Sequence, residues 1–240
     1  MGEKQSKVKI GVLGAGAISG IYFQNLTELF REVEVWAVCD LFREKAAEAG
    51  EKYGIPRVYD TMEELLRDKE IEIVLNLTRP NEHYATTKAA LLAGKHVYSE
   101  KPLAATYEEG AELAALAAER GLLLGGAPDT FLGAGIQTCR RLIDDGMIGD
   151  VIGAEAKMVC HGHESWHPAP EFYYQYGGGP MMDMGPYYMT ALVNLIGRVQ
   201  SISGMTGTAF PQRIITSKPK QGTVVDVEVP THTTGLMKFQ

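Results

Sequence analysis

The sequence is short of cysteine and has no long apolar run, and these two absences exclude a disulfide scaffold and a membrane-spanning chain. Its three cysteines, Cys39, Cys139 and Cys160, are odd in number, far apart and outside any C-x-x-C spacing. The pattern predicts buried thiols in a reducing compartment, with the cytoplasm as the default. No run reaches the length of a membrane span, and the polar start leads into a short, glycine-broken run that fits no secretory signal.

Basic residues are also fewer than acidic residues. The 240 residues include 23 Lys and Arg against 30 Asp and Glu, which gives a formal charge of −7. Proteins that bind nucleic acid or anionic lipid need a basic face, so we expect neither nucleic acid nor membrane as a partner. Because 45% of the residues are hydrophobic, the chain can bury a core, and a small soluble molecule is the expected partner.

The first half of the chain alternates short apolar runs with helical patterns, which is the rhythm of βαβ units around a parallel sheet. Strands are predicted at residues 7–14, 33–40, 71–77, 96–100 and 122–127. Helices are predicted at residues 17–30, 43–53, 62–67, 82–93 and 107–120. Capping boxes open two of these helices, Thr61 with Glu64 and Thr106 with Glu109. The pattern predicts an α/β fold, a doubly wound parallel Rossmann sheet over residues 1–125.

The parallel rhythm stops after Gly126. A helix ending at Gly146, a long strand over 149–163, a polar aromatic loop, a helix over 186–196 and strand-like runs at 200–208, 223–229 and 231–239 follow in that order. This order predicts an α+β substrate-binding domain over residues 126–240, built on a largely antiparallel sheet. Because the last residues lie inside a strand-like run, we expect the protein to continue beyond Gln240.

A glycine turn follows the first predicted strand. Gly14-x-Gly16 lies between strand and helix, where glycine permits a tight turn and close approach of a pyrophosphate. Ser19 stands where a third glycine is usual, and a small residue there still allows the helix to pack on the strand. The turn predicts a dinucleotide site, and its expected binding residues are Gly14, Gly16, Ala17 and Ile18.

Asp40 ends the second predicted strand, where an acid is expected to accept hydrogen bonds from the adenosine ribose. Its negative charge would repel a 2′-phosphate, which favours NAD over NADP. Arg43 keeps NADP open because an arginine in the next helical turn could reach a phosphate. Alternatively, Asp40 only caps that helix.

Two motifs in "NLTRPNEHYATTKAALLAGKHVYSEKPLAAT" resemble the Gfo/Idh/MocA oxidoreductase family. A turn after the fourth strand of that family contains threonine, proline and histidine, and Glu-Lys-Pro follows the fifth. Here they are Thr78, Pro80 and His83, and then Glu100, Lys101 and Pro102. Together with the glycine turn, the resemblance covers roughly residues 7–200, and three ordered motifs are far more specific than one.

The resemblance implies that Lys101 lies between the nicotinamide and the substrate hydroxyl, and that Glu100 positions it. A lysine at the carboxyl end of a parallel strand also points toward the crevice where open α/β sheets bind ligands. The alternative is a surface pair of Lys101 with Glu100. The remaining cofactor-side residues implied by the resemblance are Thr78, Pro80, Asn81 and His83, with no proton transfer expected from His83.

A second acid-containing segment, "GGGPMMDMGPYYMT", resembles the family's substrate side, where an acid is followed four residues later by a histidine. Asp183 and Tyr187 occupy these positions, so tyrosine stands where histidine is commonest, as in members similar to glucose-fructose oxidoreductase. The resemblance implies that Asp183 and Tyr187 hold the substrate hydroxyl while Lys101 moves its proton. Alternatively, Asp183 caps the helix that Pro186 begins, and Tyr187 is a core aromatic residue.

Three further features of the sequence could belong to a site: a group of histidines, an aromatic loop and an acid in a turn. His161, His163 and His167 include a His-x-His pair that would share one face of a strand and could bind metal. No carboxylate or cysteine completes a usual ligand set, and the resemblance implies hydride transfer without metal, so no metal site is predicted. The aromatic loop from Trp166 to Tyr176 suits stacking on a sugar ring or packing against a neighbouring subunit. Asp129 could touch substrate, although acids are common in turns.

These features predict an NAD(P)-dependent oxidoreductase that transfers a hydride between a nicotinamide and a hydroxyl-bearing carbon of a sugar, cyclitol or related polyol. Two alternatives stay open: an NAD-dependent glycosidase on the same fold, and a nucleotide-binding sensor without catalytic activity. The resemblance also implies a homo-oligomer, a dimer or tetramer.

Overall fold

The computed structural model describes residues 6–240. The chain divides after Ala127 into an N-terminal unit and a C-terminal unit, Pro128–Gln240. The polar start of the sequence, residues 1–5, lies outside the described residues. Each unit has its own sheet structure and its own buried residues. Among residues 6–240, no helix combines the length and the apolar character that a membrane crossing requires.

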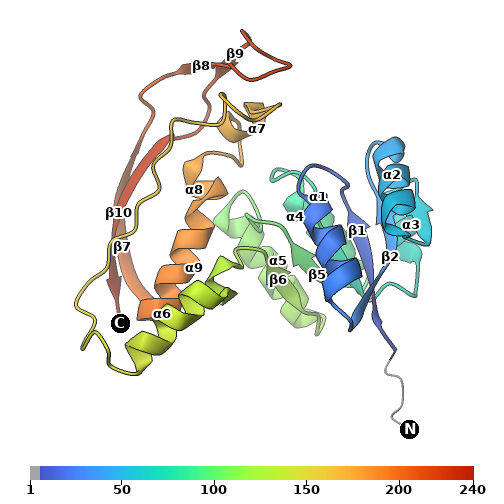
Figure 1. The fold of residues 1–240 in the computed structure, drawn as a ribbon, viewed down its shortest axis with the longest axis horizontal. Helices are drawn as coiled ribbons and strands as arrows, with labels where there is room; N and C mark the ends of the chain where they lie inside the picture. The colour runs from blue at the N-terminus through green and yellow to red at the C-terminus, as the bar shows by residue number, and fades with distance from the viewer. Residues whose placement is uncertain (1–5) are drawn as a thin grey trace. The chain divides into compact units, whose positions relative to one another are not determined.

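The N-terminal unit is built on a six-stranded parallel sheet with the strand order β3-β2-β1-β4-β5-β6 (Figure 1). The strands are β1 (Val8–Leu13), β2 (Val33–Cys39), β3 (Arg57–Tyr59), β4 (Ile73–Asn76), β5 (His96–Ser99) and β6 (Leu124–Gly126). The helices are α1 (Ser19–Gln24), a π-helical turn (Asn25–Leu29), α2 (Arg43–Tyr53), α3 (Met62–Arg67), α4 (His83–Leu92) and α5 (Tyr107–Glu119). The strand order reverses between β1 and β4, so the predicted doubly wound sheet is confirmed.

Two apolar clusters hold this sheet between its helices. Phe23 of α1 and Ala46 of α2 pack with Val12 and Val38 in one cluster, and residues of α3, α4 and α5, such as Leu65, Leu91 and Leu113, form the other. Strands covered on both faces need nearly continuous apolar sequences, and β1 and β2 have them.

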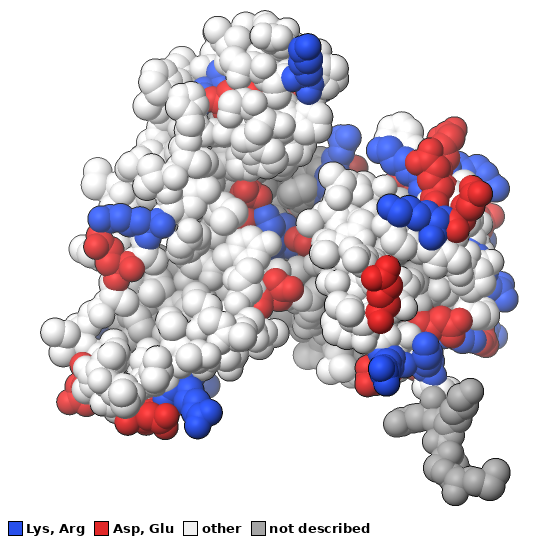
Figure 2. Space-filling view, viewed as in Figure 1, with Lys and Arg blue, Asp and Glu red and all other residues white. Residues whose placement is uncertain are grey.

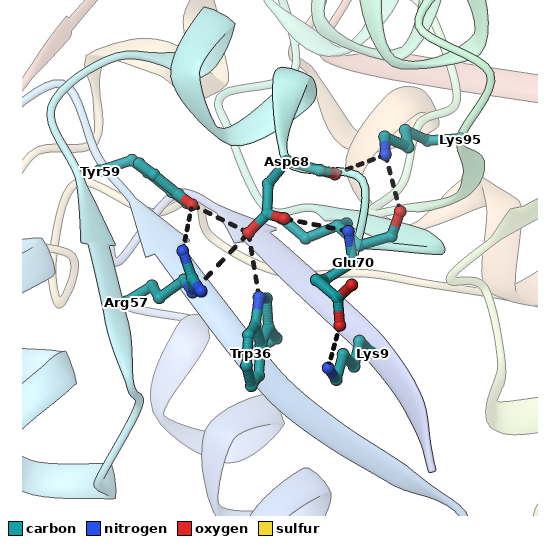
Figure 3. Close-up of polar contacts among 8 residues, drawn as sticks. Lys9, Trp36, Arg57, Tyr59, Asp68, Glu70 and Lys95 are labelled. Carbon is teal, nitrogen blue, oxygen red and sulfur yellow. Dashed lines mark hydrogen bonds and ion pairs between the residues drawn. The ribbon is translucent and has the colours of Figure 1, made fainter. Parts of the chain in front are cut away.

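A polar cluster, which we call the Asp68 cluster, lies where α3 ends and includes side chains of β2 and β3 (Figure 3). The Asp68 carboxylate accepts hydrogen bonds from Trp36 Nε1 at 3.0 Å, Tyr59 Oη at 2.9 Å and the Glu70 backbone nitrogen at 3.0 Å. The Lys95 ammonium donates to the backbone oxygens of Asp68 and Ile71 at 2.7 and 2.8 Å. The cluster therefore joins the end of α3 to β2, β3 and the segment that precedes β4.

The C-terminal unit contains two small antiparallel pairs and several helices. Its helices are a 3₁₀ turn (Thr130–Leu132), α6 (Ala134–Asp144), α7 (Glu171–Tyr174), α8 (Pro180–Asp183) and α9 (Gly185–Ile196). Strand β7 (Val199–Gly207) pairs with β10 (His232–Phe239), and β8 (Gln212–Ile214) pairs with β9 (Val224–Asp226). This mixture of helices and antiparallel pairs confirms the predicted α+β class.

Two predictions about local structure are wrong, and one short strand was missed. Residues 151–160 form no strand, because no strand of the described residues pairs with them and an unpaired strand leaves its backbone groups unsatisfied. The three-residue edge strand β3 was not predicted because it is too short to show a periodicity. Cys39 is buried, but Cys139 and Cys160 are exposed, because α6 buries none of its residues and Cys160 belongs to the irregular segment.

Candidate active site

The glycine turn begins directly after β1. Gly14 has a φ of +101°, and a Cβ there would lie 2.6 Å from the Leu77 carbonyl oxygen, so only glycine fits. A Cβ on Gly16 would meet nothing within 4 Å. Ser19, the variant residue of the motif, is buried and donates its hydroxyl to the Gly16 carbonyl oxygen at 2.7 Å. Ala17 and Ile18 complete the turn on the exposed surface.

Asp40 lies at the carboxyl end of β2, and its carboxylate ties the two neighbouring turns together. Oδ2 accepts from the Ala15 backbone nitrogen at 2.7 Å, and Oδ1 accepts from the Phe42 backbone nitrogen at 2.8 Å. The N-cap residue of α2 is Phe42, with no side-chain capping bond, so Asp40 is not the helix cap that the alternative required. Arg43 forms an ion pair with Asp60.

A buried network fixes the turn that contains Thr78. Asn76, fully buried at the end of β4, donates to the His83 carbonyl oxygen at 3.2 Å and to Thr87 Oγ1 at 3.0 Å. Its Oδ1 accepts from the hydroxyl and the backbone nitrogen of Thr78 at 2.7 and 3.2 Å. Asn76 was missed as a site residue, although an asparagine in an otherwise apolar strand is a signal because a buried amide needs partners.

His83 connects this turn with the Glu-Lys-Pro segment. Its ring is 1% exposed, with Nε2 2.9 Å from the Thr78 carbonyl oxygen and Nδ1 2.6 Å from the Pro102 carbonyl oxygen. The histidine therefore holds two loops of one sheet edge at a fixed distance. Pro80 is half-buried and Asn81 is exposed in the intervening turn.

Glu100 and Lys101 follow the end of β5. The Glu100 carboxylate accepts from the Lys101 backbone nitrogen at 2.9 Å and from Tyr22 Oη at 2.8 Å. Lys101 is half-buried. Tyr22, which comes from α1, was also missed because nothing in the sequence links it to a residue 78 positions away. Gly14, Asp40, Thr78 and Lys101 follow β1, β2, β4 and β5, so the structure brings them to the carboxyl edge of one parallel sheet.

Asp183 and Tyr187 belong to the C-terminal unit, whereas Lys101 belongs to the N-terminal unit. Asp183 ends α8 and Tyr187 lies in the first turn of α9, and both are half-buried. Asp183 Oδ2 lies 3.4 Å from His163 Nε2. Asp129 is exposed, and its carbonyl oxygen closes the 3₁₀ turn by accepting from the Leu132 backbone nitrogen at 2.9 Å.

The three loop histidines have different surroundings. His161 is exposed, His163 is buried and His167 is half-buried. The strand that was to align His161 with His163 is absent, so the pair shares no strand face. Within residues 6–240, no group of three or more His, Cys, Asp or Glu side chains is arranged to hold a metal ion. Figure 2 shows acidic and basic residues interspersed, without a continuous basic area on the face in view.

Two known protein families match successive parts of the chain. Residues 8–126 match the family described as "Oxidoreductase family, NAD-binding Rossmann fold", and residues 136–240 match the one described as "GFO/IDH/MocA C-terminal domain". The chain belongs to the Gfo/Idh/MocA oxidoreductase family. The resemblance inferred from Thr78, His83 and Lys101 is thereby confirmed.

Several curated relatives are named as dehydrogenases. D-xylose dehydrogenase of Paenarthrobacter nicotinovorans is 30% identical over 174 residues, which cover 70% of this chain and 45% of that protein. Trans-1,2-dihydrobenzene-1,2-diol dehydrogenase of Bos taurus is 32% identical over 222 residues, which cover 90% of this chain and 61% of that protein. The chain thus spans about half the length of the curated relatives it matches.

A solved structure shares the fold of the chain. Levoglucosan dehydrogenase, solved in complex with NADH and L-sorbose, superposes with a TM-score of 0.80 at 19% identity. The match covers 97% of this chain and 64% of that one.

The residues of this Gfo/Idh/MocA chain fit a dinucleotide. Gly14 is required by the protein's own backbone, but the space beside Gly16 is open, so its lack of a side chain leaves room for a ligand to approach the turn. The Asp40 carboxylate is already oriented by two backbone donors, and each carboxylate oxygen can accept more than one hydrogen bond. The N-terminal unit therefore has the shape and the polar groups of an NAD-binding Rossmann domain.

Proposed function

We propose that the protein is an NAD-dependent dehydrogenase that oxidises a hydroxyl-bearing carbon of a sugar, cyclitol or related polyol, or reduces the corresponding carbonyl. The observation that carries the proposal is the carboxyl edge of the parallel sheet, where the Gly14 turn, Asp40, the Thr78 turn and Lys101 lie together. Ligands of open α/β sheets bind at this edge, beside the point where the strand order reverses.

The proposed cofactor site uses the N-terminal unit. The turn around Gly14 and Gly16 would receive the pyrophosphate, and Asp40 would accept from the ribose hydroxyls. The nicotinamide end would lie near the carboxyl ends of β4 and β5, against Thr78, Pro80, Asn81, His83 and Glu100. NAD is favoured over NADP because Asp40 is negative and Arg43 is already paired with Asp60.

The proposed chemistry divides hydride and proton between two acceptors. When bound, the nicotinamide supplies the hydride chemistry. In the oxidative direction the substrate C–H bond breaks to give that hydride, while the Lys101 amine takes the hydroxyl proton and the C–O bond becomes a carbonyl. Asp183 and Tyr187 would hold the hydroxyl in line for these two transfers. The Glu100 carboxylate accepts from the Lys101 backbone nitrogen and thereby fixes the point of the backbone from which the lysine side chain extends.

The substrate class follows from the relatives, which act on D-xylose and on a benzene dihydrodiol, and from a fold neighbour solved with L-sorbose. All three compounds carry neighbouring hydroxyl groups. The free thiols Cys39, Cys139 and Cys160 support the cytoplasm as the proposed compartment, and a dimer or tetramer is the proposed assembly.

Turnover by the full-length protein tests the proposal. Purified protein is incubated with NAD or NADP and D-xylose, myo-inositol, levoglucosan or trans-1,2-dihydrobenzene-1,2-diol, and reduced nicotinamide is followed by its absorbance. We expect turnover with NAD and at least one polyol. Failure to reduce either dinucleotide with any of the four, while dinucleotide still binds, would favour a sensor without catalytic activity.

Lys101→Ala tests the proposed proton acceptor. The variant should lose about 10²–10⁴-fold in kcat, the usual contribution of a general acid or base, while it still binds the dinucleotide. Lys69→Ala is the matched control because Lys69 is exposed in the turn before β4, at the opposite edge of the sheet. If Lys101→Ala and Lys69→Ala turn over equally fast, the assignment of Lys101 is wrong.

A further inference from the structure

The C-terminal unit contains a buried imidazole that the proposed mechanism does not use. His163 is 8% exposed although it lies in the polar loop between the irregular segment and α7. Its ring stacks on Tyr173 with ring centroids 3.9 Å apart and an interplanar angle of 22°. Trp166 packs against it at 4.7 Å, and Phe172 meets it edge-on at 6.3 Å. Aromatic contacts from three residues restrict rotation of the ring.

The orientation of this ring brings Nε2 to the acid of the site. His163 Nε2 lies 3.4 Å from Asp183 Oδ2, and the side chains are 11% and 19% exposed respectively. A neutral imidazole carries one N–H, and a carboxylate only accepts, so the tautomer with hydrogen on Nε2 suits this contact.

The other ring nitrogen is left without a partner. Among the described residues, His163 Nδ1 is buried and makes no hydrogen bond. A buried polar atom without a hydrogen-bond partner is unfavourable in a folded protein. As a bare acceptor, Nδ1 costs less than an unpaired N–H would, which again favours hydrogen on Nε2.

The loop that carries His163 is anchored by its neighbours. The His163 carbonyl oxygen accepts from the backbone nitrogen of His167 at 3.0 Å. The next residue, Glu164, is bonded by the Arg213 Nε at 2.9 Å and by the Tyr174 hydroxyl. The Glu164 carbonyl oxygen also accepts from the backbone nitrogens of Thr216 and Ser217 at 2.8 and 2.9 Å. Precise placement of a functional side chain requires support of this kind.

Two ionisable side chains, Tyr173 and His167, lie beside the ring of His163. Burial raises the pKa of Tyr173 well above its usual range, and the charge of Asp183 adds to this shift, so the phenol stays neutral. Burial and the neighbouring His163 lower the pKa of His167.

We propose that His163 is a positioning residue for Asp183: hydrogen on Nε2 bonds to Oδ2, fixes the plane of the carboxylate and thereby aligns it with the substrate hydroxyl. The inference rests on the proposed function, since it assigns a partner to an acid of that site. His163 itself does not touch the reacting atoms. It acts by limiting the rotation of a carboxylate whose direction matters in the transition state.

The tautomer of His163 gives a test that does not require turnover. Full-length protein labelled with ¹⁵N-histidine is studied by long-range ¹H–¹⁵N NMR, with the His163 signals assigned by their loss in His163→Gln. We expect the Nε2–H tautomer in the unmodified protein and a mixture of tautomers in Asp183→Ala. An Nδ1–H tautomer in the unmodified protein, or no change in Asp183→Ala, would overturn the proposal.

Steady-state kinetics test the effect on catalysis. His163→Phe keeps the stacked ring but removes the donor, and His163→Gln keeps a donor that can reach the position of Nε2. With the best substrate of the panel, we expect kcat to fall at least tenfold in His163→Phe with a smaller change in KM, and to recover to within about threefold in His163→Gln. His161→Gln is the control, because His161 belongs to the same loop but its side chain is exposed.

The outcomes separate this inference from the function on which it rests. Equal kcat values for His163→Phe and His161→Gln, in a protein that is otherwise active, overturn the positioning role alone. Equal losses in His163→Phe and His163→Gln do the same, because they indicate a packing role. An unmodified protein without turnover overturns the proposed function, and the role of His163 falls with it. If His163→Phe does not fold, the tautomer of His163 in the Asp183→Ala variant decides whether the positioning role holds.

Discussion

Gly14 and Gly16 belong to one turn, but the backbone of the chain requires a glycine only at the first of these positions. At Gly14 the chain itself excludes a side chain, because φ is +101° and the Leu77 carbonyl oxygen would lie 2.6 Å from a Cβ. At Gly16 nothing in the chain lies within 4 Å of such an atom. The first glycine is therefore explained by folding, whereas the open space beside the second leaves room for a dinucleotide to approach the turn.

Alanine at each position separates these two roles. Gly14→Ala should destabilise the N-terminal unit by about 2–4 kcal/mol through backbone strain and the close contact with Leu77. Gly16→Ala should change the free energy of unfolding by less than about 0.5 kcal/mol but weaken NAD binding about tenfold or more. Thermal unfolding and NADH fluorescence measure the two effects. Unchanged NADH affinity in Gly16→Ala would contradict the placement of the dinucleotide at this turn.

The sequence predicts residues of the site that follow strands and belong to motifs, such as Asp40 and Lys101. It does not predict residues whose role depends on a contact between distant segments. Tyr22 bonds Glu100 across 78 positions, and His163 meets Asp183 only because an irregular loop folds back on α8. Such contacts leave no periodic pattern in the sequence, so only the structure reveals them.

At the scale of secondary-structure elements, local signals decided which predictions succeeded. The capping boxes at Thr61 and Thr106 are both present, and α3 and α5 begin directly after them. The predicted first helix, by contrast, begins later, at Ser19, and ends in a π-helical turn. The strand predicted over 149–163 failed because strand formation depends on a partner, which a local pattern of apolar residues cannot guarantee.

The Asp68 cluster joins α3, β2, β3 and β4 and makes stability depend on pH. Burial opposes ionisation of Asp68, but hydrogen bonds from the Glu70 backbone, Tyr59 and Trp36 outweigh it and lower its pKa. A carboxyl with a lowered pKa in the folded state stabilises fully above its unfolded value, about 4, and this stabilisation is lost as the pH falls through the folded value.

Asp68→Asn tests this contribution. At pH 7 the variant should be less stable by about 1–3 kcal/mol, because Trp36 and Tyr59 lose a charged acceptor. The difference from the unmodified protein should shrink as the pH is lowered below about 4. Urea unfolding from pH 3 to 7 measures it. Glu70→Gln is the control, because Glu70 is in the same turn but its side chain is 57% exposed. If the difference in stability between Asp68→Asn and the unmodified protein stays constant from pH 3 to 7, the role of Asp68 is contradicted.

At the scale of the whole molecule, the two units are stabilised in different ways. The N-terminal unit has a continuous apolar core on both faces of its sheet. In the described part of the C-terminal unit, the apolar cluster is small and consists of Tyr173, Tyr174, Ile215 and Val225, with Phe172 and Val227 packed against it. A small core leaves more of the stability to polar contacts, and the buried pair of Glu164 with Arg213 lies beside this cluster.

The Glu164–Arg213 pair connects the loop of His163 to β8. Burial opposes ionisation of Glu164, but hydrogen bonds from Tyr174 and Arg213 outweigh it and lower its pKa. The two side chains are 5% and 16% exposed, so removal of one partner leaves a buried charge. Arg213→Met should therefore cost about 3–5 kcal/mol in the free energy of unfolding of the C-terminal unit.

The double variant Arg213→Met with Glu164→Gln should recover much of this loss, because the remaining amide can still accept from Tyr174 and carries no charge. Denaturant unfolding of both variants, followed by near-UV circular dichroism of the aromatic loop, measures the coupling. If the pair also anchors His163, Arg213→Met should broaden the His163 NMR signals even at temperatures where the protein stays folded. Sharp, unshifted signals would mean that the aromatic contacts alone hold the ring in place.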